Sequence, residues 1–269
     1  MKRGEIKTGS AWAVVTGAGS GIGRCYALRL SKLGYRVLLV GNKIEPLEKV
    51  QAEINASSPA KATYKSIDLA RIEAAQELFD YTQQEKMNVD VLVNNAGMFS
   101  FCDILDTPQE RIERIILLHD MTTTKTCRLF AEDMIQRKVR GHILNMASYS
   151  IWMPFPGMAL YSASKAYLKS FSEAFSREVQ DEGIRVTAIC PAGVATDLYG
   201  LAPKLQRLGL RLGVLISPDN CARRGLRAMW KGRRVIVPDW WNRLWIPICK
   251  HLPMCILRPI RRRTMQFQK

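Results

Sequence analysis

A glycine-rich turn between an apolar run and a helical stretch constrains this chain more than any other feature of its sequence. The apolar run Ala11–Thr16 leads directly into Gly17-Ala18-Gly19-Ser20-Gly21-Ile22-Gly23, where a helical pattern begins. Glycines here let the backbone turn tightly and approach a pyrophosphate, while the free N–H groups and positive dipole end of the new helix face the anion. The succession of strand, glycine turn and helix predicts a dinucleotide-binding unit.

The rest of the chain alternates between apolar, β-rich runs and helical stretches. Predicted strands cover Ala11–Thr16, Arg36–Val40, Ala62–Ser66, Asp90–Val93, His142–Met146, Ile184–Ile189 and Arg234–Val237, and predicted helices cover Gly23–Leu33, Pro46–Ser57, Ile72–Lys86, Pro108–Arg137, Leu160–Glu182 and Asp219–Lys231. Strands that are apolar throughout are typical of parallel strands covered on both faces. With 269 residues and no repeat or linker, we expect one α/β domain: a doubly wound, seven-stranded parallel sheet with helices on both faces.

Further motifs follow in a fixed order. Asn94-Asn95-Ala96-Gly97 follows the fourth predicted strand, Ser148 follows the fifth, Tyr161-Ser162-Ala163-Ser164-Lys165 begins thirteen residues after Ser148, and Pro191–Thr196 follows the sixth. Together with the TGxxxGxG form of the glycine turn, they resemble the short-chain dehydrogenase/reductase family over about residues 10–200. The resemblance implies a Rossmann-type catalytic domain, which we place at residues 1–238, and a nicotinamide dinucleotide cofactor.

Several segments are expected to contact that cofactor. The resemblance assigns adenine contact to Asp68 and the nicotinamide amide to the segment after the sixth strand. The expected cofactor-binding residues are Gly17, Ser20, Gly21, Ile22, Gly23, Asn42, Lys43, Asp68, Leu69, Asn95, Ala96, Gly97, Tyr161, Lys165, Pro191, Val194 and Thr196.

The end of the second strand bears on the choice between NADP(H) and NAD(H). An acidic residue there bonds the ribose 2′-hydroxyl of NAD, whereas a basic residue accommodates the 2′-phosphate of NADP. This chain has Gly41-Asn42-Lys43, with no carboxylate, which favours NADP(H). Two points weigh against that choice: the arginine often found at position 42 in NADP-using relatives is absent, and Lys43 fits equally well as a solvated lysine.

Tyr161 and Lys165 stand four residues apart, so they are neighbours on one helix face. A tyrosine hydroxyl has an ordinary pKa of about 10, and an adjacent ammonium lowers the pKa by stabilising the tyrosinate. The resemblance assigns Tyr161 as proton donor or acceptor, Lys165 as its partner and a ligand of the nicotinamide ribose, and Ser148 as the group that polarises the substrate carbonyl. Where relatives carry an asparagine that anchors a water chain to the lysine, this chain has His119. His119 could take over that hydrogen bonding, could titrate near neutral pH, or could simply be packed in its helix.

Apolar residues flank the expected site. The resemblance directs Phe99, Trp152, Met153 and Phe155 toward the substrate, and their bulk favours a hydrophobic carbonyl compound, although core packing explains them equally well. Residues 198–218 lie where relatives have a mobile lid. There a leucine face and a basic face could close over an apolar substrate and meet a phosphate, a coenzyme or an anionic membrane.

The charge of the chain is concentrated at its end. The 40 Lys+Arg against 24 Asp+Glu give a net charge of +16, and residues 201–269 alone carry 16 basic and 2 acidic residues. Residues 239–269 form a basic, tryptophan-rich C-terminal extension, a composition found at membrane interfaces, but one that packing on the domain or on a dimer partner also explains. We expect no nucleic-acid partner. A homodimer or homotetramer is implied by the resemblance, through helices around residues 127–137 and 160–182.

The seven cysteines form no paired framework and fit reduced thiols in a cytoplasmic protein. Cys249, His251 and Cys255 provide only three candidate ligands, so we expect no metal site. Residues 1–7 lack the apolar core of a signal peptide, and no apolar run approaches the ~18–20 residues of a membrane span. The protein is therefore expected to be cytoplasmic and soluble, or at most peripheral on a membrane.

Three functions remain open at this point. The first is an NADP(H)-dependent reductase that converts a hydrophobic ketone or 3-oxoacyl compound, lipid- or steroid-like, to a secondary alcohol. The second is a regulatory protein that holds a dinucleotide without turnover, with His119 marking a lapsed site. The third is an NAD-dependent alcohol dehydrogenase of the same family. The presence of Ser148, Tyr161 and Lys165 at the family spacing favours an enzyme.

Overall fold

The computed structural model describes residues 11–153, 155–196, 202–253 and 255–259. Its strands are β1 (Trp12–Thr16), β2 (Arg36–Gly41), β3 (Ala62–Ser66), β4 (Val89–Asn94), β5 (His142–Met146), β6 (Arg185–Ile189), β7 (Gly193–Val194), β8 (Leu215–Ile216) and β9 (Val235–Ile236). Its α-helices are α1 (Gly21–Lys32), α2 (Ile44–Ser57), α3 (Ala74–Gln84), α4 (Gln109–Ile116), α5 (Thr122–Gln136), α6 (Ala159–Glu178), α7 (Pro203–Arg211), α8 (Pro218–Trp230) and α9 (Trp240–Lys250). Shorter helical segments are η1 (Ile104–Asp106), η2 (Leu117–Met121) and η3 (Tyr149–Trp152).

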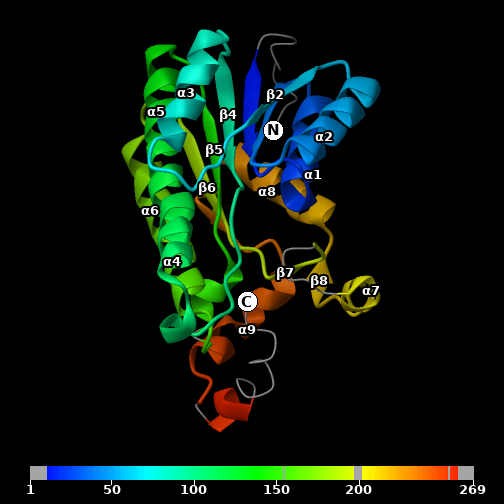
Figure 1. Ribbon diagram of the computed structural model, residues 1–269, viewed down its shortest axis with the longest axis vertical. Coiled ribbons are helices and arrows are strands. Elements are labelled where there is room, and N and C mark those ends of the chain that lie inside the picture. Colours follow the sequence, from blue (N-terminus) through cyan, green and yellow to red (C-terminus); the bar gives the residue numbers. More distant parts are fainter. Residues whose placement is uncertain (1–10, 154, 197–201, 254, 260–269) are drawn as a thin grey trace.

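The main sheet has seven strands in the order β3-β2-β1-β4-β5-β6-β9, and all of its neighbours pair in parallel. Helices α1, α2 and α8 cover one face, and α3, α5 and α6 cover the other (Figure 1). The predicted doubly wound α/β fold is therefore confirmed. Strands β2 and β3 lie on one side of β1, and β4 and the later strands lie on the other, so the strand order changes direction between β1 and β4. Open α/β sheets bind their ligands at the carboxyl ends of the strands at such a point.

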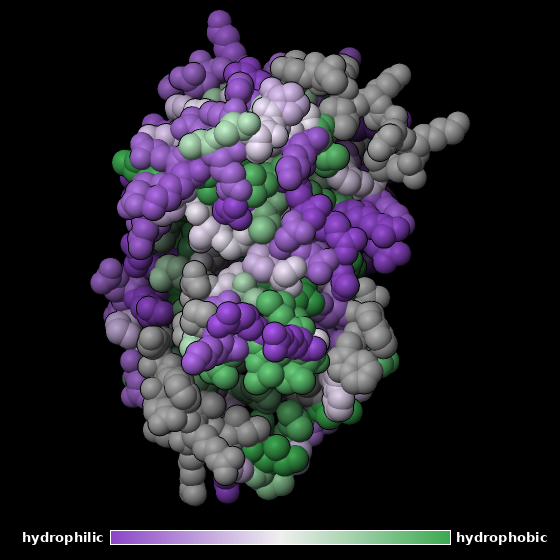
Figure 2. Space-filling view, turned by 90° about the vertical axis from the view of Figure 1, so that its right-hand side faces the viewer, coloured by the Kyte–Doolittle hydropathy of each residue, from purple (hydrophilic) through white to green (hydrophobic). Residues whose placement is uncertain are grey.

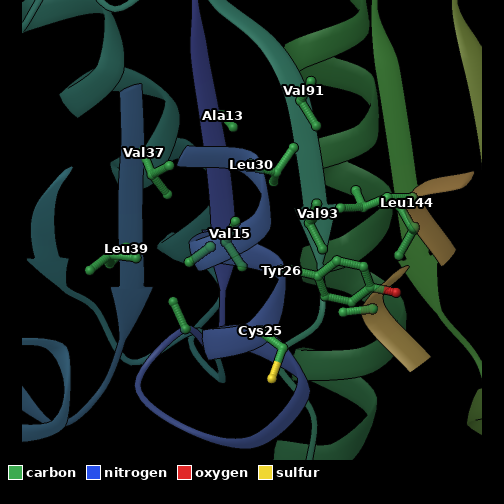
Figure 3. Close-up of a cluster of buried hydrophobic side chains, with 14 of the residues drawn as sticks. Ala13, Val15, Cys25, Tyr26, Leu30, Val37, Leu39, Val91, Val93 and Leu144 are labelled. Carbon is green, nitrogen blue, oxygen red and sulfur yellow. The ribbon is translucent and has the colours of Figure 1, made fainter. Parts of the chain in front are cut away.

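The side chains of β1 alternate between two hydrophobic cores because successive residues of a strand point to opposite faces. Ala13 and Val15 join the core under α1 and α8, where Tyr26 and Leu30 are fully buried (Figure 3). Trp12 and Val14 join the core on the opposite face. Burial on both faces explains why the strand sequence is apolar at every position.

The predicted continuous helix Pro108–Arg137 needs correction. Pro108 is the N-cap of α4, and between α4 and α5 the chain forms η2, a five-residue π-helical segment. One extra residue per turn changes which side chains face inward, and such segments are frequent at functional sites. His119 lies inside this segment and is fully buried.

Two further differences concern the carboxyl edge of the sheet and the region after it. The last strand is shorter than predicted and pairs only through Val235 and Ile236. An unpredicted pair of short strands, β7 and β8, joins the segment after β6 to the segment after α7. Within the predicted lid, α7 is helical, while residues 198–201 lie outside the described residues.

The described part of the chain contains no helix with both the length and the apolarity needed to cross a bilayer. The six cysteines whose side chains are described are free thiols. Across the same residues, no three His, Cys, Asp or Glu side chains gather in a way that could hold a metal ion. The side chain of Cys249 lies outside the described residues.

Candidate active site

The glycine turn after β1 forms an open cradle at the amino end of α1. Gly17 and Gly21 adopt left-handed φ angles of 64° and 53°, which glycine tolerates and other residues rarely adopt. A Cβ on Gly23 would lie 2.1 Å from the carbonyl oxygen of Gly17, so the helix and the turn pack too closely for any side chain. Because no side chain caps α1, its first N–H groups remain available to an anion.

The turn after β4 holds the glycine turn in place. Thr16 Oγ1 accepts hydrogen bonds from the backbone N–H groups of Asn95 and Ala96, each at 3.0 Å. Asn95 Nδ2 in turn donates to the carbonyl oxygens of Thr16 and Gly17, at 3.0 and 3.3 Å. The side chain of Asn95 therefore joins two loops at the carboxyl edge of the sheet, and both loops border the same cavity.

Ser148, Tyr161 and Lys165 come together from two elements beside this cradle. Ser148 follows β5 as the N-cap of η3, and its Oγ accepts from Ser150 N–H at 3.1 Å, which leaves the hydroxyl proton for another acceptor. Tyr161 and Lys165 lie one turn apart on α6, with Lys165 Nζ 5.8 Å from the centroid of the Tyr161 ring. The ring of Phe99 packs edge-on against Tyr161 at 5.1 Å.

Lys165 is a buried cation. Its Nζ donates to the carbonyl oxygen of Met146 at 2.9 Å. Burial lowers its pKa from 10.5 to about 7, and the nearby Asp120 and Cys190 oppose that shift. The pKa of Asp120 rises to about 6, mainly because of its own burial. Burial thus disfavours the ammonium form of this side chain.

His119 is held in one tautomer by its neighbours. Its Nε2 lies 3.0 Å from the backbone N–H of Met98, which can only donate, so Nε2 is the acceptor and carries no proton. The proton is then on Nδ1, which donates to Ser164 Oγ at 2.8 Å, and Ser164 Oγ donates to the carbonyl oxygen of Tyr161 at 3.0 Å. Burial, and secondarily Lys165, lower the pKa of His119 well below 6.5. The direction of this shift argues against the option that His119 titrates near neutral pH.

Gly97 is the point at which these groups meet the cradle. A Cβ on Gly97 would lie 3.1 Å from His119 Nε2 and 3.4 Å from Lys165 Nζ. A Cβ at this position would therefore be tight against His119 and in contact with Lys165. The glycine of the Asn-Asn-Ala-Gly turn therefore lets the backbone after β4 pass directly over the buried histidine and lysine.

A cavity of about 530 Å³ extends from the glycine turn to the Ser148, Tyr161 and Lys165 side chains. A second cavity of about 460 Å³ adjoins it, and Ser148, Tyr161 and Pro191 line both. The second cavity has a predominantly apolar lining that includes Phe99, Met153, Met158, Val214, Leu215 and Trp245. The arrangement places a phenol, a hydroxyl and an ammonium at the junction of a phosphate-compatible cavity and an apolar one.

Comparisons with known proteins agree with this geometry. The family model described as short chain dehydrogenase matches residues 11–204. This chain belongs to the short-chain dehydrogenase family. It is 33% identical over 241 residues to a very-long-chain 3-oxoacyl-CoA reductase from Laccaria bicolor, an alignment covering 86% of this chain and 69% of the relative. It is also 33% identical over 196 residues to 17-beta-hydroxysteroid dehydrogenase type 3 from Danio rerio, covering 70% of this chain and 62% of that protein.

The chain thus spans about two thirds of the length of these two curated relatives. Among solved structures, a short-chain dehydrogenase from Sphingobium yanoikuyae in complex with NADPH superposes with a TM-score of 0.76 at 27% identity, covering 87% of this chain and 92% of that one. Family membership makes this protein an oxidoreductase with a Rossmann-type fold.

The cavities of this dehydrogenase collect most of the residues expected from the sequence. The first cavity is lined by thirteen of them, namely Gly17, Ser20, Gly21, Ile22, Asn95, Ala96, Gly97, Ser148, Tyr161, Lys165, Pro191, Val194 and Thr196. Two of the four expected substrate residues, Phe99 and Met153, line the second cavity. The residues that the motifs and the family resemblance singled out therefore gather around one cavity.

Other expected residues lie outside the two linings. Gly23 supports the turn from behind, and Asn42 and Lys43 are exposed beyond β2. Asp68 forms an ion pair with Arg114, with Nη2 and Oδ2 3.0 Å apart, and accepts from Ala70 N–H, while Leu69 is buried and its carbonyl oxygen accepts from Thr122 Oγ1. The lining also excludes Phe155 and Trp152, whose ring packs 5.6 Å from that of Tyr149.

Sequence reasoning placed residues 198–218 over the substrate as a lid, but it did not name the individual residues after 204 that line the two cavities. Gln206 of α7 borders the first cavity. Val214, Leu215, Asn242 and Trp245 border the second cavity, and Tyr149 Oη donates to the carbonyl oxygen of Asn242 at 2.7 Å, fixing α9 against η3. The tryptophan-rich composition singled out the region of α9, but no motif in the sequence indicated that α9 lies beside Ser148.

Proposed function

We propose that this dehydrogenase is an NADP(H)-dependent reductase of a hydrophobic ketone or 3-oxoacyl compound, lipid- or steroid-like, which it converts to a secondary alcohol. The observation that carries the proposal is the junction of the two cavities at Ser148 and Tyr161. A dinucleotide along the first cavity and an apolar carbonyl compound in the second would meet at these two side chains. The names of the relatives, a 3-oxoacyl-CoA reductase and a hydroxysteroid dehydrogenase, support this substrate class.

The residues present fit a nicotinamide dinucleotide. The cradle around Gly17 and Gly21 and the uncapped end of α1 would hold the pyrophosphate, and Pro191, Val194 and Thr196 line the same cavity. When bound, the nicotinamide supplies the hydride for the carbonyl carbon. The protein's own side chains then have to bind the carbonyl oxygen, provide a proton and exclude water.

Each of these tasks has a candidate residue. Ser148 has a hydroxyl proton to donate to the carbonyl oxygen, because its lone pair already accepts from Ser150 N–H. Tyr161 holds the proton that the oxygen receives. Lys165 donates to Met146 and retains two further N–H groups, which can serve the ribose hydroxyls and favour the tyrosinate once the proton has left. The rings of Phe99 and Trp245 keep the second cavity apolar.

The proposal is tested by following NADPH oxidation with a series of ketones of increasing chain length. We expect turnover that Tyr161→Phe lowers at least about 100-fold, since the general acid is lost, while NADPH binding followed by its fluorescence is retained. Failure of the wild-type protein to reduce any ketone of the series, despite binding NADPH, would favour the regulatory dinucleotide-binding function instead.

The preference for NADP(H) rests on the end of β2. Asn42 and Lys43 are exposed there, and the nearest carboxylates of α2 are already engaged, Glu45 with Lys49 and Glu48 with Tyr64. A 2′-phosphate would therefore meet a cation without a competing anion. We expect Lys43→Glu to raise KM for NADPH about 10-fold or more and to leave KM for NADH nearly unchanged. The matched control is Lys61→Glu, because Lys61 is an exposed lysine just before β3, at the amino end of that strand. An equal rise in KM for NADPH in both variants would contradict the proposed preference for NADP(H).

A further inference from the structure

An exposed apolar surface lies around the mouth of the second cavity. Helix α7 and the turn after it expose large parts of Leu205, Leu208, Leu212 and Val214, at 55%, 51%, 67% and 64%, and α9 exposes Leu244, Trp245 and Ile248. We call these seven residues the apolar rim. Val214 and Trp245 also line the second cavity, so the two parts of the rim stand on either side of one opening. Figure 2 views the side on which α7 lies, and apolar side chains gather in the lower half of that face with hydrophilic ones across them.

The described charged residues of α7 and of the turn after it are all positive. On α7 the leucines at 205, 208 and 212 repeat at helical spacing, and Lys204, Arg207 and Arg211 repeat at the same spacing on the adjacent face, all three exposed. No acidic residue occurs in the sequence between 202 and 216. The next two acidic residues after this stretch, Asp219 and Asp239, are paired with Arg29 and Arg224. The nearest acidic residue before it, Asp197, lies outside the described residues. The rim therefore combines exposed leucine and tryptophan with a row of three exposed cations.

This combination identifies the chemistry of the partner. Apolar side chains exposed over a continuous area are unfavourable in water and mark an interaction surface. A second copy of the same face would bring like charges together, which opposes self-association through the rim. An anionic lipid surface satisfies both features, since cations approach the headgroups while leucine and tryptophan insert at the acyl boundary. We propose that the apolar rim docks this dehydrogenase onto an anionic bilayer, with the mouth of the second cavity facing the lipid.

Docking itself requires only the rim and its cations. Its use for substrate entry rests on the proposed function, because a hydrophobic ketone dissolved in the bilayer would then reach Ser148 and Tyr161 through the second cavity without crossing water. The experiment therefore measures attachment to vesicles, which does not require turnover, so a failure of docking is distinguishable from a failure of the reductase proposal.

The full-length protein is sedimented with vesicles of phosphatidylcholine alone and of phosphatidylcholine mixed with phosphatidylglycerol. We expect binding to the anionic vesicles only, weakened by high salt. The triple variant Lys204→Gln, Arg207→Gln, Arg211→Gln should lower the partition coefficient about 100-fold. Each cation near an anionic surface strengthens binding by a similar factor, and the three factors multiply. The double variant Leu208→Gln, Leu212→Gln should lower it at least about 10-fold by removing apolar contact with the acyl boundary.

The control for charge is Lys86→Gln, Lys138→Gln, Arg140→Gln, three exposed cations beside the amino ends of β4 and β5. It removes the same number of charges from the opposite edge of the sheet and should bind vesicles like the wild type. Circular dichroism and thermal unfolding establish that each variant is folded. The proposal is overturned if the wild type ignores anionic vesicles, if the control loses as much binding as the α7 variant, or if sedimentation velocity shows the rim buried in a dimer that the leucine variant dissociates.

Discussion

Gly23 is the glycine with the least room in the turn, although it does not line the cavity itself. A methyl group at this position would overlap the carbonyl oxygen of Gly17 and the amide of Asn95, the side chain that joins the two loops. We expect Gly23→Ala to destabilise the protein by about 2 kcal/mol or more and to abolish measurable NADPH binding, because the turn must move to admit the methyl group. Urea unfolding and fluorescence titration measure the two effects.

Gly183 supplies the control for this substitution. It has a φ of 82° and only one side-chain atom near the position of a Cβ, Arg140 Cγ at 3.8 Å. Gly183→Ala should therefore cost about 1 kcal/mol from backbone strain alone and leave NADPH binding intact. If both variants behaved alike, steric overlap at the turn would not be the cause.

Lys165 gives the stability a predictable pH dependence. Its pKa is about 7 in the folded protein against an ordinary 10.5, so between these values the unfolded chain holds a proton that the folded chain has released. Unfolding then takes up a proton, and stability rises with pH. Relative to Lys165→Met, the wild type should gain about 2 kcal/mol of unfolding free energy between about pH 7 and about pH 9. A constant difference between the two proteins in urea unfolding would contradict a buried, weakly basic amine.

His119 shows where residue-level reasoning from sequence ends. Its position in the chain was predicted, but the direction of its pKa depends on complete burial and on the nearby Lys165. Its tautomer depends on the backbone N–H of Met98, which belongs to a loop after a different strand. Partners of this kind are set by tertiary packing, so the sequence left hydrogen bonding and titration both open.

At the scale of elements, η2 decides which way His119 faces. A π-helical turn holds one more residue than an α-turn, so deleting one residue from it lets the turn close with α-helical spacing, and the residues inside the turn then point in a different direction. We expect deletion of Met121, an exposed residue of η2, to break the bonds from His119 to Met98 and Ser164. Ketone reduction should fall at least about 10-fold with helix content preserved in circular dichroism. Met121→Ala keeps the length and should retain activity.

Strands were more predictable than the breaks within helices. The central strands of the main sheet lie between two apolar cores, so their sequences are largely continuous apolar runs that stand out in the chain. The segment 108–137 carries a helical pattern throughout, and nothing in that pattern marks the extra residue of η2. The short strands β7 and β8 were not predicted either; each has two residues, and they pair across the segment that contains α7.

At the scale of the whole molecule, the two cavities should respond independently to substitution. Ala192 lines only the second cavity. Ala192→Phe should therefore lower kcat/KM for a long-chain ketone at least about 10-fold while leaving NADPH affinity within about 2-fold, since the added ring fills substrate space alone. A short ketone provides the control and should lose less. An equal loss for both ketones would mean that the substrate does not occupy this cavity.

The sequence motifs located the first cavity almost completely because they follow the carboxyl ends of β1, β4, β5 and β6, which parallel pairing brings to one edge. The second cavity depends on α9 and β8, whose contacts with η3 and β7 join residues far apart in the chain. Such contacts have no local signature. The substrate side of the molecule was consequently the part that sequence reasoning described least well.

The wall that Val214, Leu215, Asn242 and Trp245 contribute comes from beyond residue 204, where the match to the family ends. The groups that would perform the chemistry all lie before that residue. Under the proposed function, mutations could thus accumulate in the distal segment and retune which molecules are accepted without disturbing the reaction centre. Such a separation would let related reductases acquire different substrate specificities while they keep the same catalytic residues.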